Sequence, residues 1–113
     1  MPNDASNLIA LCDAAAVEED APVAVPSVDI TYAVFRLGDD FFVMDDICNH
    51  GPGSLCEGFI EDGQVECPFH QGRFDIRTGA ATLAPCVDPQ RIWTAHVVDG
   101  KICIDPSERR IGA

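Results

Sequence analysis

The chain has 113 residues and a mass of 12.1 kDa, which suits a single domain with its own core. Nineteen acidic and seven basic residues give a formal net charge of −12. This charge argues against nucleic acid as a partner, because phosphates need Lys and Arg to neutralise them, and it disfavours a membrane surface in the same way. No apolar stretch approaches the roughly 20 residues that cross a bilayer, and the first basic residue is Arg36, so we expect a soluble cytoplasmic protein without a signal peptide.

The first thirty residues predict little regular structure. Residues 1–7 are expected to form a loose tail. Residues 13–19 have helical propensity and a possible cap at Asp13, but the segment is too short for more than a turn or two. Pro22 and Pro26 then flank a short extended segment, which we place at a sheet edge because proline has no amide hydrogen to donate.

Three hairpins are predicted in the rest of the chain. Residues 32–37 show the alternation of a strand, and a three-residue loop joins them to the apolar residues 41–44. Residues 59–60 and 64–66 flank a second loop of the same length. Residues 92–98 and 101–105 are joined by Asp99-Gly100, the strongest short hairpin signal in the sequence. Residues 107–113 are expected to form a second loose tail. The pattern as a whole predicts an all-β domain.

Two short segments each combine a cysteine with a histidine: Cys48-Asn49-His50 and, after residues 51–66, Cys67-Pro68-Phe69-His70. This set suits a Rieske-type 2Fe-2S cluster, in which two histidines replace two of the four cysteines on one iron. Neutral imidazoles in place of thiolates raise the reduction potential into a window of roughly −150 to +300 mV. A structural zinc site is the alternative, but zinc knuckles usually pair like ligands, so the spacing favours iron–sulfur.

Residues 45–85 extend this signature with Gly51, with Glu66-Cys67-Pro68-Phe69-His70-Gln71-Gly72-Arg73-Phe74-Asp75, and with Thr78-Gly79. They resemble the small Rieske ferredoxins of bacterial aromatic-ring dioxygenase systems, which serve aromatic hydrocarbon catabolism; the resemblance is weakest before about Ile30. It implies a Rieske fold of antiparallel sheets within one domain (1–113), with a cluster-binding subdomain of two hairpin loops at about 45–86. It also implies one 2Fe-2S cluster with these ligands: Cys48, His50, Cys67 and His70.

Glycine and proline in the ligand loops permit tight turns, whose backbone N–H groups we expect to point at the cluster sulfurs. The residues concerned are Gly51, Pro68 and Gly72. Pro85 matches a proline loop that covers the cluster in the resembling proteins. In that family the two histidines lie at the exposed tip of the domain.

The resemblance implies an electron carrier and not an enzyme. Such a ferredoxin takes one electron at a time from a flavin-dependent reductase to a terminal Rieske non-haem iron oxygenase that hydroxylates an aromatic ring. The oxygenase itself needs a mononuclear iron held by two histidines and a carboxylate, and His96 is the only histidine left over. A small Rieske subunit of another reductase, such as an assimilatory nitrite reductase, is the alternative. The oxygenase selects the aromatic substrate, so this chain does not identify it.

The resemblance also indicates which subtype of Rieske protein the chain is. The high-potential respiratory type carries two further cysteines, where Gly53 and Phe69 stand here, and two hydroxyl donors, where Gly72 and Phe74 stand. We therefore expect a potential toward the low end of the Rieske window. The other cysteines are expected to be apolar fillers or surface thiols: Cys12, Cys56, Cys86 and Cys103. Trp93 is expected to pack structurally, and Arg73 and Arg77 to form surface ion pairs.

Overall fold

The computed structural model describes residues 8–19, 21–28, 30–47, 53–68, 71–84 and 88–111. Within these ranges the chain consists of antiparallel β-strands and short 3-10 helices, and it has no α-helix. The 3-10 helices are η2 (Ala14–Ala16), η3 (Leu55–Glu57) and η4 (Pro106–Glu108). The prediction of an all-β fold is therefore confirmed. None of the helices in the described ranges is long and apolar enough to span a membrane.

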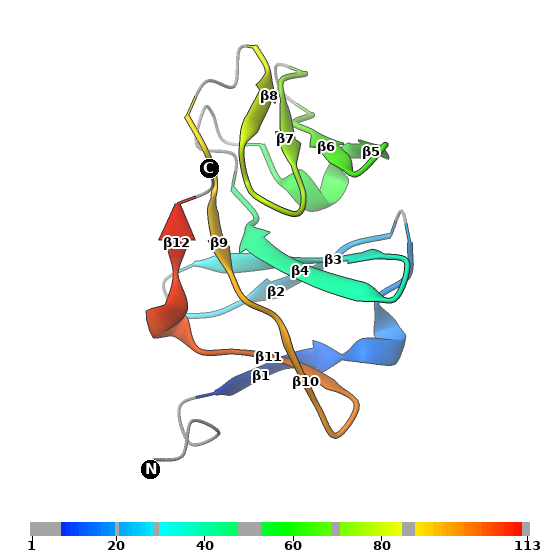
Figure 1. Cartoon of the computed structure of the whole chain (residues 1–113), viewed down its shortest axis with the longest axis vertical. Coiled ribbons are helices and arrows are strands. Elements are labelled where there is room, and N and C mark those ends of the chain that lie inside the picture. The colour runs from blue at the N-terminus through cyan, green and yellow to red at the C-terminus, as the bar shows by residue number, and fades with distance from the viewer. Residues whose placement is uncertain are drawn as a thin grey trace.

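Three antiparallel sheets lie one above another along the long axis of the molecule (Figure 1). The middle sheet has five strands in the order β12 (Arg110–Ile111), β9 (Arg91–Trp93), β4 (Asp40–Asp45), β3 (Thr31–Leu37) and β2 (Val23–Pro26). At one end lies a four-stranded sheet of β5 (Phe59–Glu61), β6 (Gln64–Glu66), β7 (Arg73–Asp75) and β8 (Ala81–Leu83). At the other end, β11 (Lys101–Ile104) lies between β1 (Ile9–Asp13) and β10 (His96–Val98).

The middle sheet is covered on both faces because β3 and β4 carry apolar side chains at successive positions. Side chains on one face share a core with the four-stranded sheet: Ala33, Phe35, Met44, Val65 and Phe74. Those on the other face share a second core with the three-stranded sheet: Tyr32, Val34, Val43, Ile102 and Ile104. Successive strand residues point to opposite faces, so an uninterrupted apolar run gives a strand that is buried on both sides.

The first two predicted hairpins are present, but their loops are one residue shorter than predicted. Leu37 pairs with Asp40, and Glu61 pairs with Gln64, so each loop has two residues. In the first of these loops Gly38 has a φ of 65°. Two-residue turns with positive φ fit the right-handed twist of paired strands, which explains why the chain prefers them to three-residue loops.

The third hairpin is confirmed at Asp99-Gly100, whose φ values of 51° and 78° are those of a type I′ turn. The predicted strand 92–98 is divided, however. Its first part is β9, which pairs with β4 in the middle sheet, and its second part is β10, which pairs with β11. The break at Thr94 and Ala95 lets one stretch of chain join two sheets.

Both ends of the described chain are more ordered than the sequence predicts. Strand β1 was not predicted, and Asp13 does not cap η2 with its side chain but accepts a hydrogen bond from Lys101 at 2.8 Å. The expectation of a loose tail from residue 107 is wrong as far as residue 111, because η4 leads into β12, which pairs with β9. Residues 1–7 and 112–113 lie outside the described residues. The predicted edge position of β2 is confirmed.

Candidate metal centre

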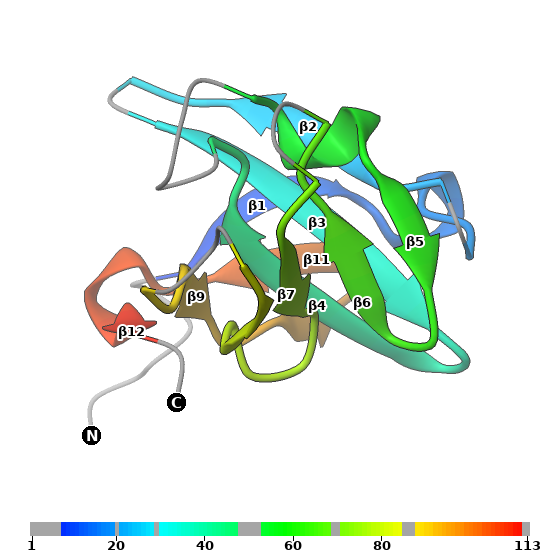
Figure 2. The ribbon, with the colours of Figure 1, turned by 90° about the horizontal axis from the view of Figure 1, so that it is seen from above.

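Strands β4 and β6, which precede the two predicted ligand segments, belong to the middle sheet and the four-stranded sheet, which Figure 2 shows from above. The first segment follows β4 and the second follows β6, as predicted. Of the four predicted ligands the structure describes Cys67 alone; Cys48, His50 and His70 lie outside the described residues, as do Gly51 and Pro85. The described residues hold no group of three or more metal-binding side chains. The ligand set therefore stays a prediction.

Cys67 lies at the start of a tight loop. Its N–H donates to the carbonyl of Gly72 at 2.8 Å, and its own carbonyl accepts from the N–H of Gln71 at 2.9 Å. These two amides are engaged within the loop, so the expectation that loop amides point at cluster sulfurs does not apply to them. The Cys67 thiol is free and 1% exposed, and Gly72 is buried, whereas Pro68 is exposed. A buried, unpaired thiol at a braced turn fits a thiolate ligand of iron.

Asp46 closes the neck of the first ligand loop, the place where residues 46–47 pair with residues 54–55. Its carbonyl accepts from the N–H of Leu55 at 2.7 Å, and Ile47 and Ser54 form a bridge next to this bond. Its carboxylate accepts from the Ser54 hydroxyl at 2.7 Å and from the Cys56 N–H at 2.9 Å. Because Asp46 is only 3% exposed, these bonds compensate for the burial of its charge.

Cys56 lies beside this neck and is half-buried. Burial, and next the hydrogen bond to the Asp46 carboxylate, raises the pKa of the Cys56 thiol well above its usual range. A thiol with a raised pKa stays protonated at neutral pH when no metal is bound to it. Burial likewise raises the pKa of Cys12. Within the described residues Cys12, Cys56 and Cys103 are free thiols, and Cys86 lies outside them.

Gln90 and Arg91 hold the strand end that leads into the same loop. The Gln90 side-chain amide donates to the carbonyls of Asp45 at 2.8 Å and Ile47 at 2.7 Å. The Arg91 guanidinium is ion-paired with the Asp45 carboxylate, which also accepts from the Ile47 N–H at 3.1 Å. Neither the two aspartates nor Gln90 was recognised from the sequence. Two adjacent acids just before a predicted ligand were the available signal; Gln90 carried none.

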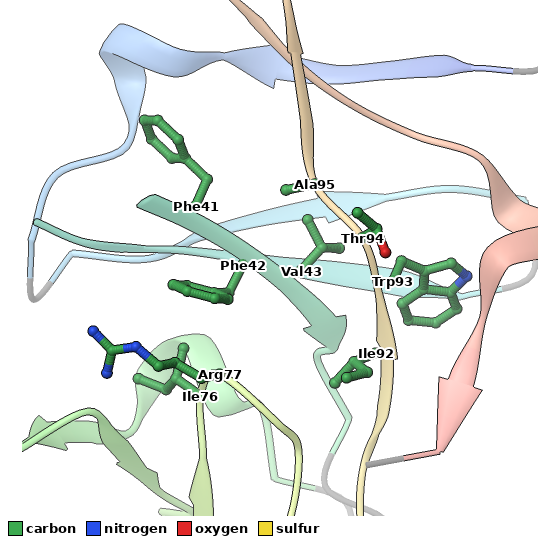
Figure 3. Close-up of a pocket in the computed structure, with 9 residues that line it drawn as sticks. All are labelled: Phe41, Phe42, Val43, Ile76, Arg77, Ile92, Trp93, Thr94 and Ala95. Carbon is green, nitrogen blue, oxygen red and sulfur yellow. The ribbon is translucent and has the colours of Figure 1, made fainter. Parts of the chain in front are cut away.

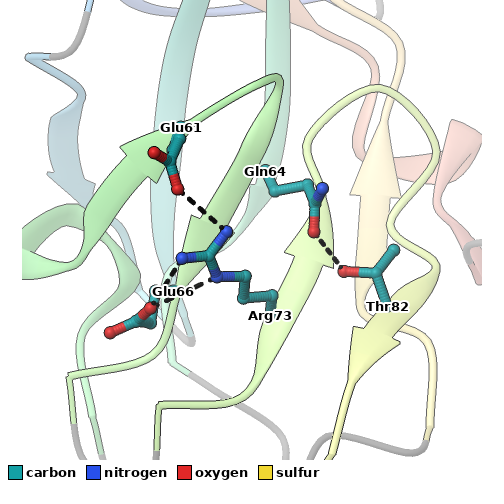
Figure 4. Close-up of polar contacts among 5 residues, drawn as sticks. All are labelled: Glu61, Gln64, Glu66, Arg73 and Thr82. Atoms are coloured by element: carbon teal, nitrogen blue, oxygen red, sulfur yellow. Dashed lines mark hydrogen bonds and ion pairs between the residues drawn. The ribbon is translucent and has the colours of Figure 1, made fainter.

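The second ligand loop is flanked by charged side chains on the outer face of its sheet (Figure 4). Arg73, which follows the loop, pairs with Glu66 at 3.1 Å and with Glu61 at 3.3 Å. The predicted ion pairing of Arg73 is thus confirmed. On the neighbouring strands the Thr82 hydroxyl donates to the Gln64 side-chain carbonyl at 2.7 Å. The Arg73 pairs join β5, β6 and β7 next to the loop, whereas the Thr82–Gln64 bond joins β6 and β8 at the end of β6 away from the loop.

A pocket of about 150 Å³ lies at the seam between the middle and four-stranded sheets (Figure 3). The guanidinium of Arg77 is 5.7 Å from the centroid of the Phe42 ring at its rim. Trp93 lines the pocket and meets Tyr32 edge to face, with ring centroids 4.9 Å apart, so its predicted structural role is confirmed. No cysteine or histidine lines this pocket, and it is not a candidate metal site.

Comparisons with known proteins agree with this arrangement. The family model of the Rieske [2Fe-2S] domain matches residues 7–97. The anthranilate 1,2-dioxygenase ferredoxin subunit of Burkholderia cepacia is 50% identical over 84 residues, which cover 74% of this chain and 78% of the relative. The solved ferredoxin of Sphingomonas yanoikuyae B1 superposes with a TM-score of 0.83 at 40% identity, over 86% of this chain and 96% of that one.

A further solved structure bears on the function. It is described as the complex of reduced oxygenase and oxidized ferredoxin in carbazole 1,9a-dioxygenase, and its matched chain superposes with a TM-score of 0.84 at 31% identity. The match covers 92% of this chain and 96% of that chain.

The chain therefore belongs to the Rieske [2Fe-2S] domain family. It is a ferredoxin, an electron carrier and not an enzyme, and its cofactor is a Rieske-type 2Fe-2S cluster. Membership of this family sets aside a structural zinc site.

Proposed function

We propose that Cys48 and His50 on the first loop, with Cys67 and His70 on the second, hold the cluster between the two loops. The observation that carries this proposal is the placement of the two loop necks. The first neck ends β4 and is closed by Asp46, and the second lies between β6 and β7 and is closed by the bond from Cys67 to Gly72. When bound, the cluster supplies one-electron redox chemistry near the potential that mixed ligation sets.

We propose further that this ferredoxin accepts its electron from a flavin-dependent reductase and delivers it to a terminal aromatic-ring-hydroxylating oxygenase. The relatives named as dioxygenase ferredoxin subunits and the ferredoxin–oxygenase complex of the carbazole system support this route. The net charge of −12 supports electrostatic steering toward basic patches on both partners. A single domain over 1–113 and a cytoplasmic location stay predictions.

The ligand set is tested by single substitutions in the purified holoprotein. Cys67→Ser and His70→Ala should lose the visible absorption of the cluster and the EPR signal of its reduced form. Cys12→Ser is the matched control, because Cys12 lies in β1 of the sheet at the opposite end of the fold, and it should keep both signals. Retention of a wild-type EPR signal by His70→Ala would contradict the proposed set.

The electron route is tested by reconstitution. The holoprotein is combined with a flavin-dependent reductase, a terminal oxygenase and an aromatic substrate, and the hydroxylated product is measured. Omission of the ferredoxin, or its replacement by Cys67→Ser, should abolish product formation. If product forms equally without the ferredoxin, or if only a nitrite reductase accepts its electrons, the proposed route is wrong.

A further inference from the structure

We propose that Gln90 is a positioning residue for the metal centre, fixing the orientation of the first ligand segment relative to the sheet that carries the second. The inference rests on the proposed ligand set, since it concerns how that set is held. Gln90 is 1% exposed and lies at the residue before β9, far in sequence from both ligand segments.

The side chain of Gln90 acts on the peptide unit that enters the first ligand segment. Its Nε2 donates to the carbonyls of Asp45 and Ile47 at 2.8 and 2.7 Å. The Ile47 carbonyl belongs to the same planar peptide unit as the nitrogen of Cys48, so holding this oxygen holds the plane from which Cys48 departs. One side-chain amide, which has two hydrogens to donate, therefore holds the carbonyls of both Asp45 and Ile47 at the end of the strand.

The backbone of Gln90 reaches the other half of the site. Its N–H donates to the carbonyl of Gly79 at 2.7 Å, in the turn that joins β7 to β8. This turn is itself closed, because the Gly79 N–H donates to the Asp75 carbonyl at 2.7 Å and the Asp75 carboxylate accepts from the Arg77 N–H at 2.8 Å. Strand β7, which ends at Asp75, follows the second ligand loop directly.

Gln90 thus joins the entry of the first ligand segment to the sheet of the second through three short hydrogen bonds. A cluster with ligands from two loops depends on the relative orientation of those loops, and partners beyond the ligands orient metal ligands in this way. Loss of the side-chain amide would leave two carbonyls at the loop entry without this donor. We therefore expect the effect of a Gln90 substitution to reach the spectroscopic properties of the cluster.

The test compares substitutions of Gln90 with two controls in the holoprotein. Gln90→Met keeps the length of the side chain and removes both donors, and Gln90→Asn keeps an amide that is too short to reach both carbonyls. Gln64→Met removes a side-chain hydrogen bond from the exposed face of the four-stranded sheet, and Ile102→Val lowers stability from the second core. The readouts are the rate of cluster loss at fixed temperature, the EPR line shape of the reduced protein and the midpoint potential.

Gln90→Met should accelerate cluster loss by about tenfold or more, broaden the EPR lines and shift the potential. Gln90→Asn should show a smaller change in the same direction. Both controls should keep the wild-type line shape and potential, even where Ile102→Val lowers the melting temperature. A Gln90→Met protein with a lower melting temperature but a wild-type EPR line shape and midpoint potential would overturn the inference. If Gln90→Met does not fold, a wild-type line shape and potential in Gln90→Asn would overturn it. Absence of a Rieske EPR signal in the wild-type protein would instead contradict the proposed ligand set.

Discussion

The Arg91 guanidinium is ion-paired with the Asp45 carboxylate, whose side chain is only 7% exposed. Arg91→Met would leave this buried charge without its counter-ion, although the Ile47 N–H still donates to it at 3.1 Å. Removal of one partner of a buried pair is costly because the remaining charge stays desolvated. We expect a loss of about 1–3 kcal/mol in the free energy of unfolding, measured by urea denaturation.

A double-mutant cycle isolates this pair from other effects of the substitution. Asp45→Asn in the Arg91→Met background should recover part of the loss, because the uncompensated charge is then gone. Arg36→Met is the matched control: Arg36 donates to the carbonyl of Gly38 on the surface, and its loss should change stability by no more than about 0.5 kcal/mol. A coupling energy near zero between residues 45 and 91 contradicts the expectation.

Gly58→Ala should disrupt the four-stranded sheet. A Cβ added to Gly58 would lie 1.9 Å from the carbonyl oxygen of Glu66 and 3.2 Å from that of Leu55. Both neighbours are backbone atoms, so relief requires movement of β6 itself and of the ligand loop that follows it. We expect destabilisation of more than about 3 kcal/mol, measured by thermal unfolding, together with a lower cluster content.

Gly100→Ala provides the comparison for Gly58→Ala. A Cβ at Gly100 meets nothing within 4 Å, but the residue has a φ of +78°. Its substitution carries only the conformational strain of a left-handed residue, about 1–2 kcal/mol. Equal destabilisation by the two substitutions would show that the close contact at Gly58 is not the cause.

The ion pair between Lys101 and Asp13 predicts a specific pH dependence. The hydrogen bond from Lys101 lowers the pKa of Asp13 below its usual value, and the same bond raises the pKa of Lys101. A carboxyl whose pKa is lowered in the folded state stabilises the fold above its unfolded-state pKa, and this stabilisation is lost as the pH falls through the folded-state pKa. A lysine whose pKa is raised in the folded state stabilises the fold below its unfolded-state pKa, and this stabilisation is lost as the pH rises through the folded-state pKa.

The stability difference between wild type and Asp13→Asn should therefore be constant from about pH 5 to pH 9 and should disappear in strong acid. Because the two side chains are 54% and 64% exposed, the difference should be small and should shrink in high salt. Urea denaturation across this pH range measures it. A difference that grows as the pH falls below 4 contradicts the assigned direction.

Local patterns predicted the hairpins, since alternation and turn residues act within a few positions of each other. Asp99-Gly100 fixed its turn in this way. The same reasoning missed β1 and β12, because a strand of weak pattern forms only when a partner strand is available. Strand β1 pairs with β11 and β12 pairs with β9, and neither pairing has a local signal.

The candidate site likewise has a part that local sequence predicts and a part that depends on the tertiary fold. The Cys–His spacing is local and predicted the ligand segments, whereas the residues that hold them depend on tertiary contacts. Gln90 bonds to Asp45 and Ile47, which precede it by 45 and 43 positions in the chain. Asp46 bonds across the loop to Ser54 and Cys56. A buried polar side chain with such partners is recognised only once the fold is known, because its sequence neighbours say nothing of them.

Electron transfer to and from the partners should slow as salt rises. The net charge of −12 favours attraction to basic docking patches, and the Debye length falls from about 10 Å at 0.1 M to about 3 Å at 1 M. The second-order rate constant for reduction by the flavin-dependent reductase, measured by stopped flow, should fall several-fold over this range. Reduction by dithionite, a small anion, is the control and should become faster. A flat salt profile with the reductase argues against steering.

The reduction potential is expected to lie below about +100 mV, toward the low end of the Rieske window. Phe74 is fully buried in the core that also contains Cys67. By the resemblance to Rieske proteins, it stands where the high-potential type carries a hydroxyl. With the cluster held by the proposed ligand set, Phe74→Tyr would bring a hydroxyl donor near it. A hydrogen bond to a cluster sulfur stabilises the reduced form, so the midpoint potential should rise by roughly tens of millivolts. Phe74→Leu removes the ring without adding a donor and should show no such rise. A redox titration followed by EPR measures all three proteins; a wild-type potential above +100 mV, or equal potentials for the Tyr and Leu variants, contradicts the assignment to the low-potential type.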